Sequence, residues 1–380
     1  MDFSLNEVQQ MLQDSASKFI QNDYDFETRQ HYSKCEVGFN PDNWGVFAEL
    51  GWLALPFEEK YGGLNGSLVD LVVLHTELGK GLITEPLMST VVLSGNIIQR
   101  HGTEKQKEQL LTKIIAGEMK LALAGTESDV QHDVTRISTV AKPVSDGYMI
   151  DGFKSVVLSA SVADKIIVVA RTSGELGDTE GLSLFLVDPE QSGVIINSYP
   201  TNDGGLAADI TLQNVLVSSD HVLGETDTAY QAIKAVLNDA MVVISAEAVG
   251  AMEKLLHSTV EFTKVRQQFG KPISSFQVLQ HRMVDMFVEY EQAKSMLYFG
   301  AINIKGSDKD SNKAAAMLKI KIGNAGKIIG QSAVQLHGGM GITDELDIGH
   351  FFKRLTMINT SFGSNYEHLD YLAKQQQKVA

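Results

Sequence analysis

Apolar side chains recur along the chain at two different spacings, and the change of spacing divides the sequence into three parts. Near the start, Val8, Leu12, Ala16 and Ile20 lie four residues apart, which is the spacing of one buried face of a helix. A second run of this kind covers residues 69–82. We therefore predict that residues 1–118 form a helical domain.

The pattern changes between residues 119 and 228. Short runs that carry β-branched residues, at 147–150, 165–170 and 182–187, are separated by Gly, Asp, Ser and Pro. Such runs are typical of antiparallel strands joined by turns, so this part is predicted to be a β-barrel or a sandwich. Long helical periods return at 229–264, 278–304 and 312–337, which makes residues 229–380 a second helical domain.

Composition narrows the class of protein. The chain has 380 residues, with 32 basic and 47 acidic side chains and a net charge of −15, and it lacks the basic surplus of a nucleic-acid-binding protein. Its first residues follow an amphipathic helical pattern rather than that of a signal peptide, and we see no run of eighteen apolar residues. One cysteine, Cys35, excludes a disulfide within the chain. We expect a cytoplasmic enzyme without membrane insertion.

Two segments suit the binding of a phosphate group, although neither is specific. The run His337-Gly-Gly-Met-Gly follows a helical period, and glycine lets a backbone approach a ligand closely, but a simple helix stop has the same pattern. Arg266 and Phe269 also follow a helix, where a surface helix end explains them equally well. The sequence has no P-loop, no GxGxxG or GxSxG motif and no zinc-type histidine spacing. Spacing alone leaves the activity open.

Five motifs in the same order resemble those of the acyl-CoA dehydrogenases. They are GW…P…YGG at 51–63, HGTEKQ…GE at 101–118, AGTE…D at 124–133, VRQQFG…FQ at 265–277 and QLHGG at 335–339. The resemblance implies a helical N-terminal domain, a middle β-barrel and a C-terminal four-helix bundle. It also implies α,β-dehydrogenation of an acyl-CoA thioester: a carboxylate base removes the α-proton and FAD accepts the β-hydride. An electron-transfer flavoprotein is the expected electron acceptor.

The usual catalytic base of this family is missing. Counted from Arg354, the position of the usual glutamate holds Gly363, and the alternative position on the first long C-terminal helix holds Ala240. The next carboxylate on the same face of that helix is Glu247, seven residues or about 10 Å further along. Glu247 is the candidate base, which would require a shifted substrate; the alternative is a paired or solvated helix glutamate.

The resemblance divides the expected FAD site into two halves. On the flavin-ring side only Thr126 remains: bulkier residues 130–132 (VQH) replace a small family segment, and residues 156–158 (VVL) replace the family's WIT. Leucine cannot donate the hydrogen bond of that threonine, and valine stacks poorly on a flavin. The residues for the ADP part are all present, and in the family they reach across a subunit interface; they are Arg266, Phe269, Phe276, Gln277, Gln335, Gly338 and Gly339.

These differences point to an asymmetric subunit. The chain resembles the small or partner subunit of heteromeric members of the pimeloyl-CoA or steroid side-chain type, also in its segments 343–346 (TDEL) and 349–354 (GHFFKR). The prediction is a heterotetramer in which this chain lends the ADP half to a catalytic sister subunit. The alternatives are a self-sufficient homotetrameric dehydrogenase with an unusual base, of which Glu345 is one example, an oxygen-using flavoenzyme of the same fold, and a flavin-free scaffold.

Overall fold

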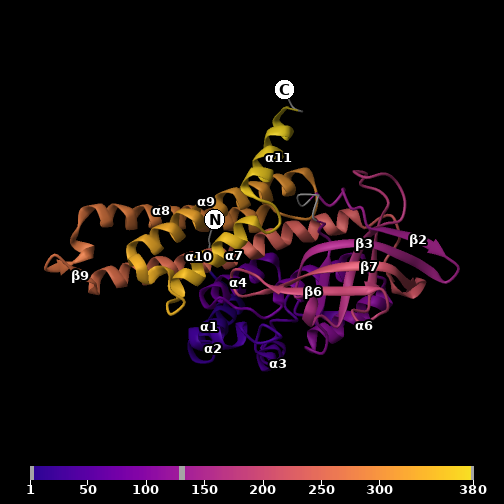
Figure 1. Cartoon of the computed structure of the whole chain (residues 1–380), viewed down its shortest axis with the longest axis horizontal. Coiled ribbons are helices and arrows are strands. Elements are labelled where there is room, and N and C mark those ends of the chain that lie inside the picture. The colour runs from indigo at the N-terminus through magenta and orange to yellow at the C-terminus, as the bar shows by residue number, and fades with distance from the viewer. Residues whose placement is uncertain (1–3, 128–132, 378–380) are drawn as a thin grey trace.

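In this computed structural model, the described residues 4–127 and 133–377 form a helical part, a sheet and a second helical part in that order (Figure 1). Side-chain caps fix several helix starts: Ser67 and Asp70 form a reciprocal capping box, as do Thr103 and Gln106. The N-terminal elements are α1 (Glu7–Asn22), α2 (Phe26–Ser33), α3 (Pro41–Glu49), α4 (Leu68–Gly81), the π-helical segment η2 (Met88–Gly95), α5 (Asn96–His101) and α6 (Glu104–Ile115).

The middle part is one eight-stranded sheet. Its strands are β1 (Leu121–Ala124), β2 (Val140–Val144), β3 (Gly147–Leu158), β4 (Lys165–Arg171), β5 (Leu182–Val187), β6 (Val194–Pro200), β7 (Leu206–Ser218) and β8 (Val222–Leu223). The hydrogen-bonded order is β6-β7-β3-β2-β4-β5-β8, with β1 added parallel to β4. The β domain is therefore as expected. Among the described residues, however, the path of pairings ends at β6 and β8 rather than closing into a barrel.

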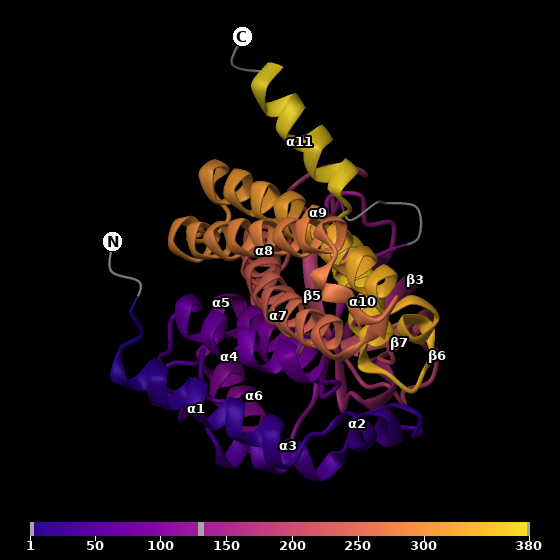
Figure 2. The same ribbon diagram turned by 90° about the vertical axis from the view of Figure 1, so that its left-hand side faces the viewer.

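The C-terminal part is the expected helical bundle with one further helix. Helices α7 (Tyr230–Val265), α8 (Gln277–Asn303), α9 (Lys309–His337) and α10 (Asp347–Thr360) share one apolar core. Between α7 and α8 the chain makes a small hairpin, β9 (Gln267–Gln268) and β10 (Lys271–Pro272). Helix α11 (Asn365–Gln377) extends away from the body and has no buried residue among those described (Figures 1 and 2).

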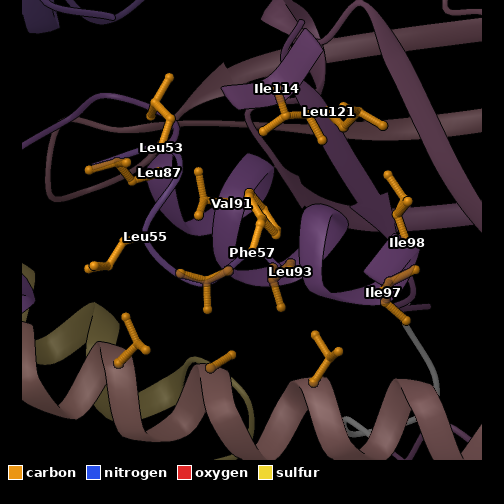
Figure 3. Packing of buried hydrophobic residues seen from close by; sticks show 14 of the residues in the cluster. Leu53, Leu55, Phe57, Leu87, Val91, Leu93, Ile97, Ile98, Ile114 and Leu121 are labelled. Carbon is orange, nitrogen blue, oxygen red and sulfur yellow. The ribbon is translucent and has the colours of Figure 1, made fainter. Parts of the chain in front are cut away.

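Helix α7 is the central helix of the molecule. It is long and apolar enough to cross a membrane by length and composition, but 94% of its most apolar stretch is buried inside the protein. One face belongs to the bundle core, and residues near its start join a second core with the N-terminal helices. That second core includes Leu53, Leu55, Phe57 and Val91 and continues to Leu121 of the sheet (Figure 3). The apolar character of α7 is thus explained by packing.

Helices α4 and α7 cross so closely that the contact requires glycine. A Cβ on Gly250 would lie 1.8 Å from the carbonyl oxygen of Thr76. Gly250→Ala is therefore expected to push the helices apart and lower the free energy of unfolding by about 1–3 kcal/mol, measured by urea denaturation. The control is Gly45→Ala in α3, whose Cβ would meet nothing within 4 Å and which should leave the stability unchanged or raise it by up to about 1 kcal/mol. Equal stabilities of the two variants would contradict the close crossing.

Candidate functional site

The predicted ADP-side residues gather at one end of the helical bundle. The ring of Phe262 near the end of α7 stacks on His337 at the end of α9, with 4.2 Å between the ring centroids. Arg266 follows Phe262 by about one helical turn, and Gly338 directly follows His337. The stacked pair therefore brings together the two segments that the sequence identified separately.

This end of the bundle presents its candidate residues to solvent. Phe269, on the hairpin between β9 and β10, is 91% exposed and meets the ring of Phe276 edge-on at 6.1 Å. Gly338 has φ +64, and a Cβ at Gly338 or Gly339 would meet nothing within 4 Å. Six of the seven candidates are exposed, namely Arg266, Phe269, Gln277, Gln335, Gly338 and Gly339, and Phe276 is half-buried. The geometry suits an anion or a ring that approaches from outside.

Thr126 is far from this bundle end. It follows β1, and its carbonyl oxygen accepts a hydrogen bond of 3.0 Å from the backbone N–H of Ser155 in β3. The sheet with β3 lies at the opposite end of the molecule from β9 (Figure 1). A single chain therefore does not bring its own ring-side and ADP-side residues together.

Glu127, which follows Thr126, forms a buried ion pair that sequence reasoning missed. The carboxylate of Glu127 accepts from Nζ of Lys154 at 2.7 Å and from the backbone N–H and hydroxyl groups of Ser138 and Thr139. Burial opposes ionisation, but Lys154 and these donors lower the pKa of Glu127 to about 2. The neighbouring substitution at 130–132, which we expected to crowd a flavin, lies outside the described residues.

Strand β3 carries the other ring-side substitutions. Val156 lies at a break in the pairing of β3 with β7, has φ +52 and is 49% exposed. A β-branched residue with positive φ is strained, and its N–H donates to Asp209 at 3.1 Å. Leu158 lines a cavity described below. These side chains supply no hydrogen-bonding group for a flavin ring, so the ring half fits the cofactor poorly, whereas the ADP half fits it well.

Gly363, at the position where the resemblance to the family places the base, packs against His368. Gly363 has φ +105, and a Cβ there would lie 2.8 Å from Nε2 of His368. A glutamate at 363 would therefore require both a strained backbone and a displaced imidazole. Burial is the largest effect that lowers the pKa of His368, to about 4, so the ring is neutral. At the alternative position, Ala240 is fully buried.

Glu247, our candidate base, is held in a buried ion network. Its two carboxylate oxygens accept from Nε and Nη2 of Arg354 at 2.5 and 2.7 Å. Nη1 of the same arginine donates to Asp203 at 2.6 Å. Burial alone would raise the pKa of Asp203, but the charge of Arg354 and its hydrogen bond lower it overall. The bidentate pair favours the paired-glutamate alternative over a base with a free oxygen.

A small cavity lies beside this network. Its volume is about 90 Å³, well below the range of about 300–1,000 Å³ that is typical of ligand pockets. It is lined by residues from all three parts of the chain, including Arg29, Glu85, Leu158, Asp203 and Arg354. Glu85 is 6% exposed, and sequence reasoning missed it because nothing in its local pattern marks a glutamate before a proline as buried.

A buried lysine in the bundle gives a prediction for pH dependence. Lys319 is fully buried, Nζ donates to the carbonyl of Ile358, and burial lowers its pKa to about 7. The unfolded chain, with a pKa near 10.4, then binds more protons than the folded chain above pH 7. Stability owing to this group therefore rises with pH by up to about 1.4 kcal/mol per unit between pH 7 and 10. Lys319→Met should abolish this part of the rise, as measured by urea unfolding at pH 7 and 9; parallel profiles would contradict it.

The comparisons with family models, with curated proteins and with solved structures all identify the same family. Models of the acyl-CoA dehydrogenase N-terminal, middle and C-terminal domains match residues 6–118, 122–215 and 229–376. The short-chain specific acyl-CoA dehydrogenase of Clostridium acetobutylicum is 28% identical over 355 residues, 92% of each chain. Butyryl-CoA dehydrogenase from Megasphaera elsdenii superposes with a TM-score of 0.90 at 26% identity, over 99% of this chain and 100% of that one. The Tcur3481-Tcur3483 steroid ACAD superposes with a TM-score of 0.88 at 27% identity, over 99% of each chain.

Proposed function

Because the chain belongs to the acyl-CoA dehydrogenase family, an FAD-dependent family of oxidoreductases acting on CH–CH bonds, we propose that it is the partner subunit of a heteromeric member. In this proposal the chain supplies the ADP-binding half of an FAD site, and a sister subunit supplies the flavin-ring half and the catalytic base. The acyl-CoA substrate is dehydrogenated on the sister subunit.

One observation carries the proposal: the ADP half of the expected FAD site keeps its residues whereas the flavin-ring half does not, and the two halves lie apart. The ADP-side residues are exposed at the bundle end, whereas β3, to which Thr126 is hydrogen-bonded, lies at the opposite end of the molecule (Figure 1). Arg266 offers a planar fork that suits a pyrophosphate, and Gly338 and Gly339 leave room for a close backbone approach. Residues at this end can serve a neighbouring subunit but not the sheet of their own chain.

The state of the base positions supports the same assignment. Gly363 has no proton-accepting group and faces His368, Ala240 is buried, and Glu247 is paired with Arg354. The neighbouring cavity of about 90 Å³ also leaves little room for an acyl group beside a flavin. These features agree with a chain that does not itself perform the proton abstraction.

The proposal also specifies the assembly, its compartment and its electron acceptor. FAD, when bound, supplies the hydride acceptor; the residues of this chain hold its ADP part. We propose a heterotetramer in the cytoplasm that passes its electrons to an electron-transfer flavoprotein. The name of the Tcur3481-Tcur3483 steroid ACAD pairs two chains, which supports a heteromeric assembly. If the chain were a self-sufficient homotetrameric dehydrogenase instead, a base other than Gly363 and Ala240 would be required.

The test is turnover by the isolated chain. The purified chain is supplied with FAD, saturated acyl-CoA thioesters of several lengths and an artificial electron acceptor, and no dehydrogenation is expected. The complex purified through a tag on this chain from its source cells should be active. Full activity of the isolated chain would refute the subunit role, and if Glu247→Gln is then equally active, Glu247 is not the base either.

A further inference from the structure

Helix α8 is apolar on two opposite faces. Its inner face joins the core of the bundle through Met286, Tyr290, Ala293 and Leu297. Its outer face, on the outside of the bundle (Figure 2), exposes large apolar side chains to between 37% and 57%, namely Val284, Phe287, Val288, Phe299 and Ile302. A surface helix of a monomer needs only one apolar face. Packing within the chain therefore explains the inner face of α8 and not the outer one.

The exposed side chains belong to one continuous stripe. The α8 stripe consists of Val284, Phe287, Val288, Glu291, Ser295, Tyr298, Phe299 and Ile302. Steps of three and four residues keep these positions on one side of the helix, over a length of about 27 Å. Glu291 is the one charged residue of the stripe, and it lies near the middle.

Helix α9 widens this apolar surface. Nζ of Lys321 in α9 donates to Glu289 and Gln292, at one side of α8, at 2.7 Å in each case. Met317, one turn before Lys321, and Ile328, two turns after it, are 37% and 40% exposed. Steps of four and seven residues place both on the edge of α9 that borders α8. An apolar surface shared by two helices marks an interaction site.

The order of side chains along the α8 stripe is nearly the same in both directions. Each member has a counterpart at the same distance on the other side of Ala293: Val284 and Ile302 at nine residues, Phe287 and Phe299 at six, Val288 and Tyr298 at five, and Glu291 and Ser295 at two. Helical spacing makes such positions symmetric, and the sequence fills them with matching side chains. A contact about a twofold axis requires this property, because residue i then meets residue j while j meets i.

Two antiparallel copies of α8 match along the whole stripe. With the twofold axis at the level of Ala293, residues 287–288 of one copy meet residues 298–299 of the other. Apolar groups then face apolar groups toward both ends, and Glu291 meets Ser295 at the centre. A partner of different sequence would not require this symmetry, so the stripe favours a second copy of the same chain.

Lys294 completes the centre of the contact. Burying the carboxylate of Glu291 in an interface is unfavourable unless a cation pairs with it. Lys294 borders the stripe, and its Nζ lies 5.7 Å from the centroid of the Tyr290 ring. In the antiparallel pair, Lys294 of one copy lies on the same side as Glu291 of the other and about 1.5 Å from its level along the axis. Two symmetry-related ion pairs can therefore form.

We propose that the α8 stripe is the surface through which this chain pairs with a second copy of itself, as antiparallel helices about a twofold axis beside Ala293. The stripe begins about two turns after Gln277, so it is separate from the ADP-side residues at the bundle end. Taken with the proposed function, on which this arrangement rests, two copies of this chain occupy the middle of the heterotetramer, and each binds one sister subunit at its bundle end.

The first test is the oligomeric state of the purified chain, measured by sedimentation equilibrium over a range of concentrations. We expect a dimer for the wild type. A well-packed aromatic side chain contributes about 30-fold or more to the affinity of an interface, and the twofold axis makes each substitution count twice. Phe287→Glu should therefore raise the dissociation constant of the dimer about 1,000-fold. Phe287 is 53% exposed, so the variant should keep the circular dichroism of the wild type.

Val8→Glu is the matched control. Val8 lies on α1 and is 67% exposed, so this variant introduces the same charge on an exposed apolar helix position outside the stripe. The dimer should be unaffected. A charge exchange tests the centre of the contact: Glu291→Lys should weaken the dimer, and Glu291→Lys combined with Lys294→Glu should restore it.

Disulfide cross-linking tests the register. Because Cys35 is the one cysteine of the chain, Cys35→Ser provides a background without thiols. Chains with Glu291→Cys and chains with Ser295→Cys are co-expressed under different tags and mildly oxidised. Cross-links should join unlike chains, since like positions are about 6 Å apart along the helix axis and a disulfide requires Cα atoms within about 7 Å in all.

The proposal is wrong if the wild-type chain is monomeric without its sister, or if a folded Phe287→Glu variant dimerises as tightly as the wild type. Efficient cross-linking of Glu291→Cys chains with one another would overturn the antiparallel register. Release of the sister subunit from the native complex by Phe287→Glu, with a monomeric isolated chain, would show that the sister covers the stripe and would equally overturn the proposal.

These measurements use neither FAD nor turnover, so they are decided separately from the half-site proposal. An isolated chain that forms a tetramer with its own FAD, and that Phe287→Glu divides into dimers, would refute the subunit role and support the α8 contact. A dimeric chain without FAD that Phe287→Glu converts to monomers would support both proposals.

Discussion

Arg266→Ala is expected to weaken FAD binding by the native complex about 10- to 150-fold. A hydrogen bond that involves a charged group contributes about 1.5–3 kcal/mol, and each 1.4 kcal/mol is about a factor of ten in affinity. Arg266 is exposed at the bundle end beside the Gly338 turn, so the substitution removes a contact rather than a structural support. The measurement is FAD per complex after dialysis against a series of FAD concentrations.

Two control variants distinguish the loss of this contact from a general effect of the substitution. Arg266→Lys keeps the charge but loses the planar fork, so it should give an intermediate loss. Arg282→Ala removes an exposed arginine of α8 and should leave FAD binding unchanged. If Arg266→Ala retains wild-type affinity while the complex stays assembled, the bundle end does not hold the ADP part, and the shared site is wrong.

Arg354→Met is expected to lower the free energy of unfolding by about 3–5 kcal/mol, since removing one partner of a buried ion pair leaves uncompensated charge. This arginine binds both Glu247 on α7 and Asp203 between β6 and β7, so it joins the bundle to the middle part. Urea denaturation, followed by tryptophan fluorescence and circular dichroism, measures the loss.

The matched variant replaces all three charges. Arg354→Met combined with Glu247→Gln and Asp203→Asn removes the three charges of this network together, so it should recover a large part of the stability. If Arg354→Met proves too unstable to purify, Glu247→Gln alone is compared with the triple variant instead, and a smaller loss of stability is expected. A single variant as stable as the wild type would show that the network contributes little.

Most of the architecture could be predicted from the sequence, for physical reasons. Long amphipathic periods predicted the bounds of α7, α8 and α9 to within a few residues, because the apolar faces of these helices pack in one core. Short β-branched runs placed β4 and β5 correctly, since they are buried on both faces. Closure of the sheet could not be predicted, because it depends on pairing between strands distant in sequence, and the open path from β6 to β8 is read only from the structure.

The candidate site was predictable only where function depends on local motifs. Arg266 and Gly338 belong to compact segments, so their pattern was visible, and the Phe262–His337 stack then joined them. The network of Arg354, Glu247 and Asp203 could not be recognised in the sequence, because Arg354 is more than a hundred residues away from either partner along the chain. Glu85 was missed for the same reason: burial of a carboxylate is a tertiary property.

The measurement that tests the account most directly is the visible absorbance spectrum of the chain purified alone, with flavin quantified per chain. The half-site account predicts little or no FAD on the isolated chain and about one FAD per pair of unlike chains in the native complex, since each pair contains one complete site. About one FAD per isolated chain would contradict it, because the ring side at Val156 and Leu158 would then hold the cofactor without a sister subunit.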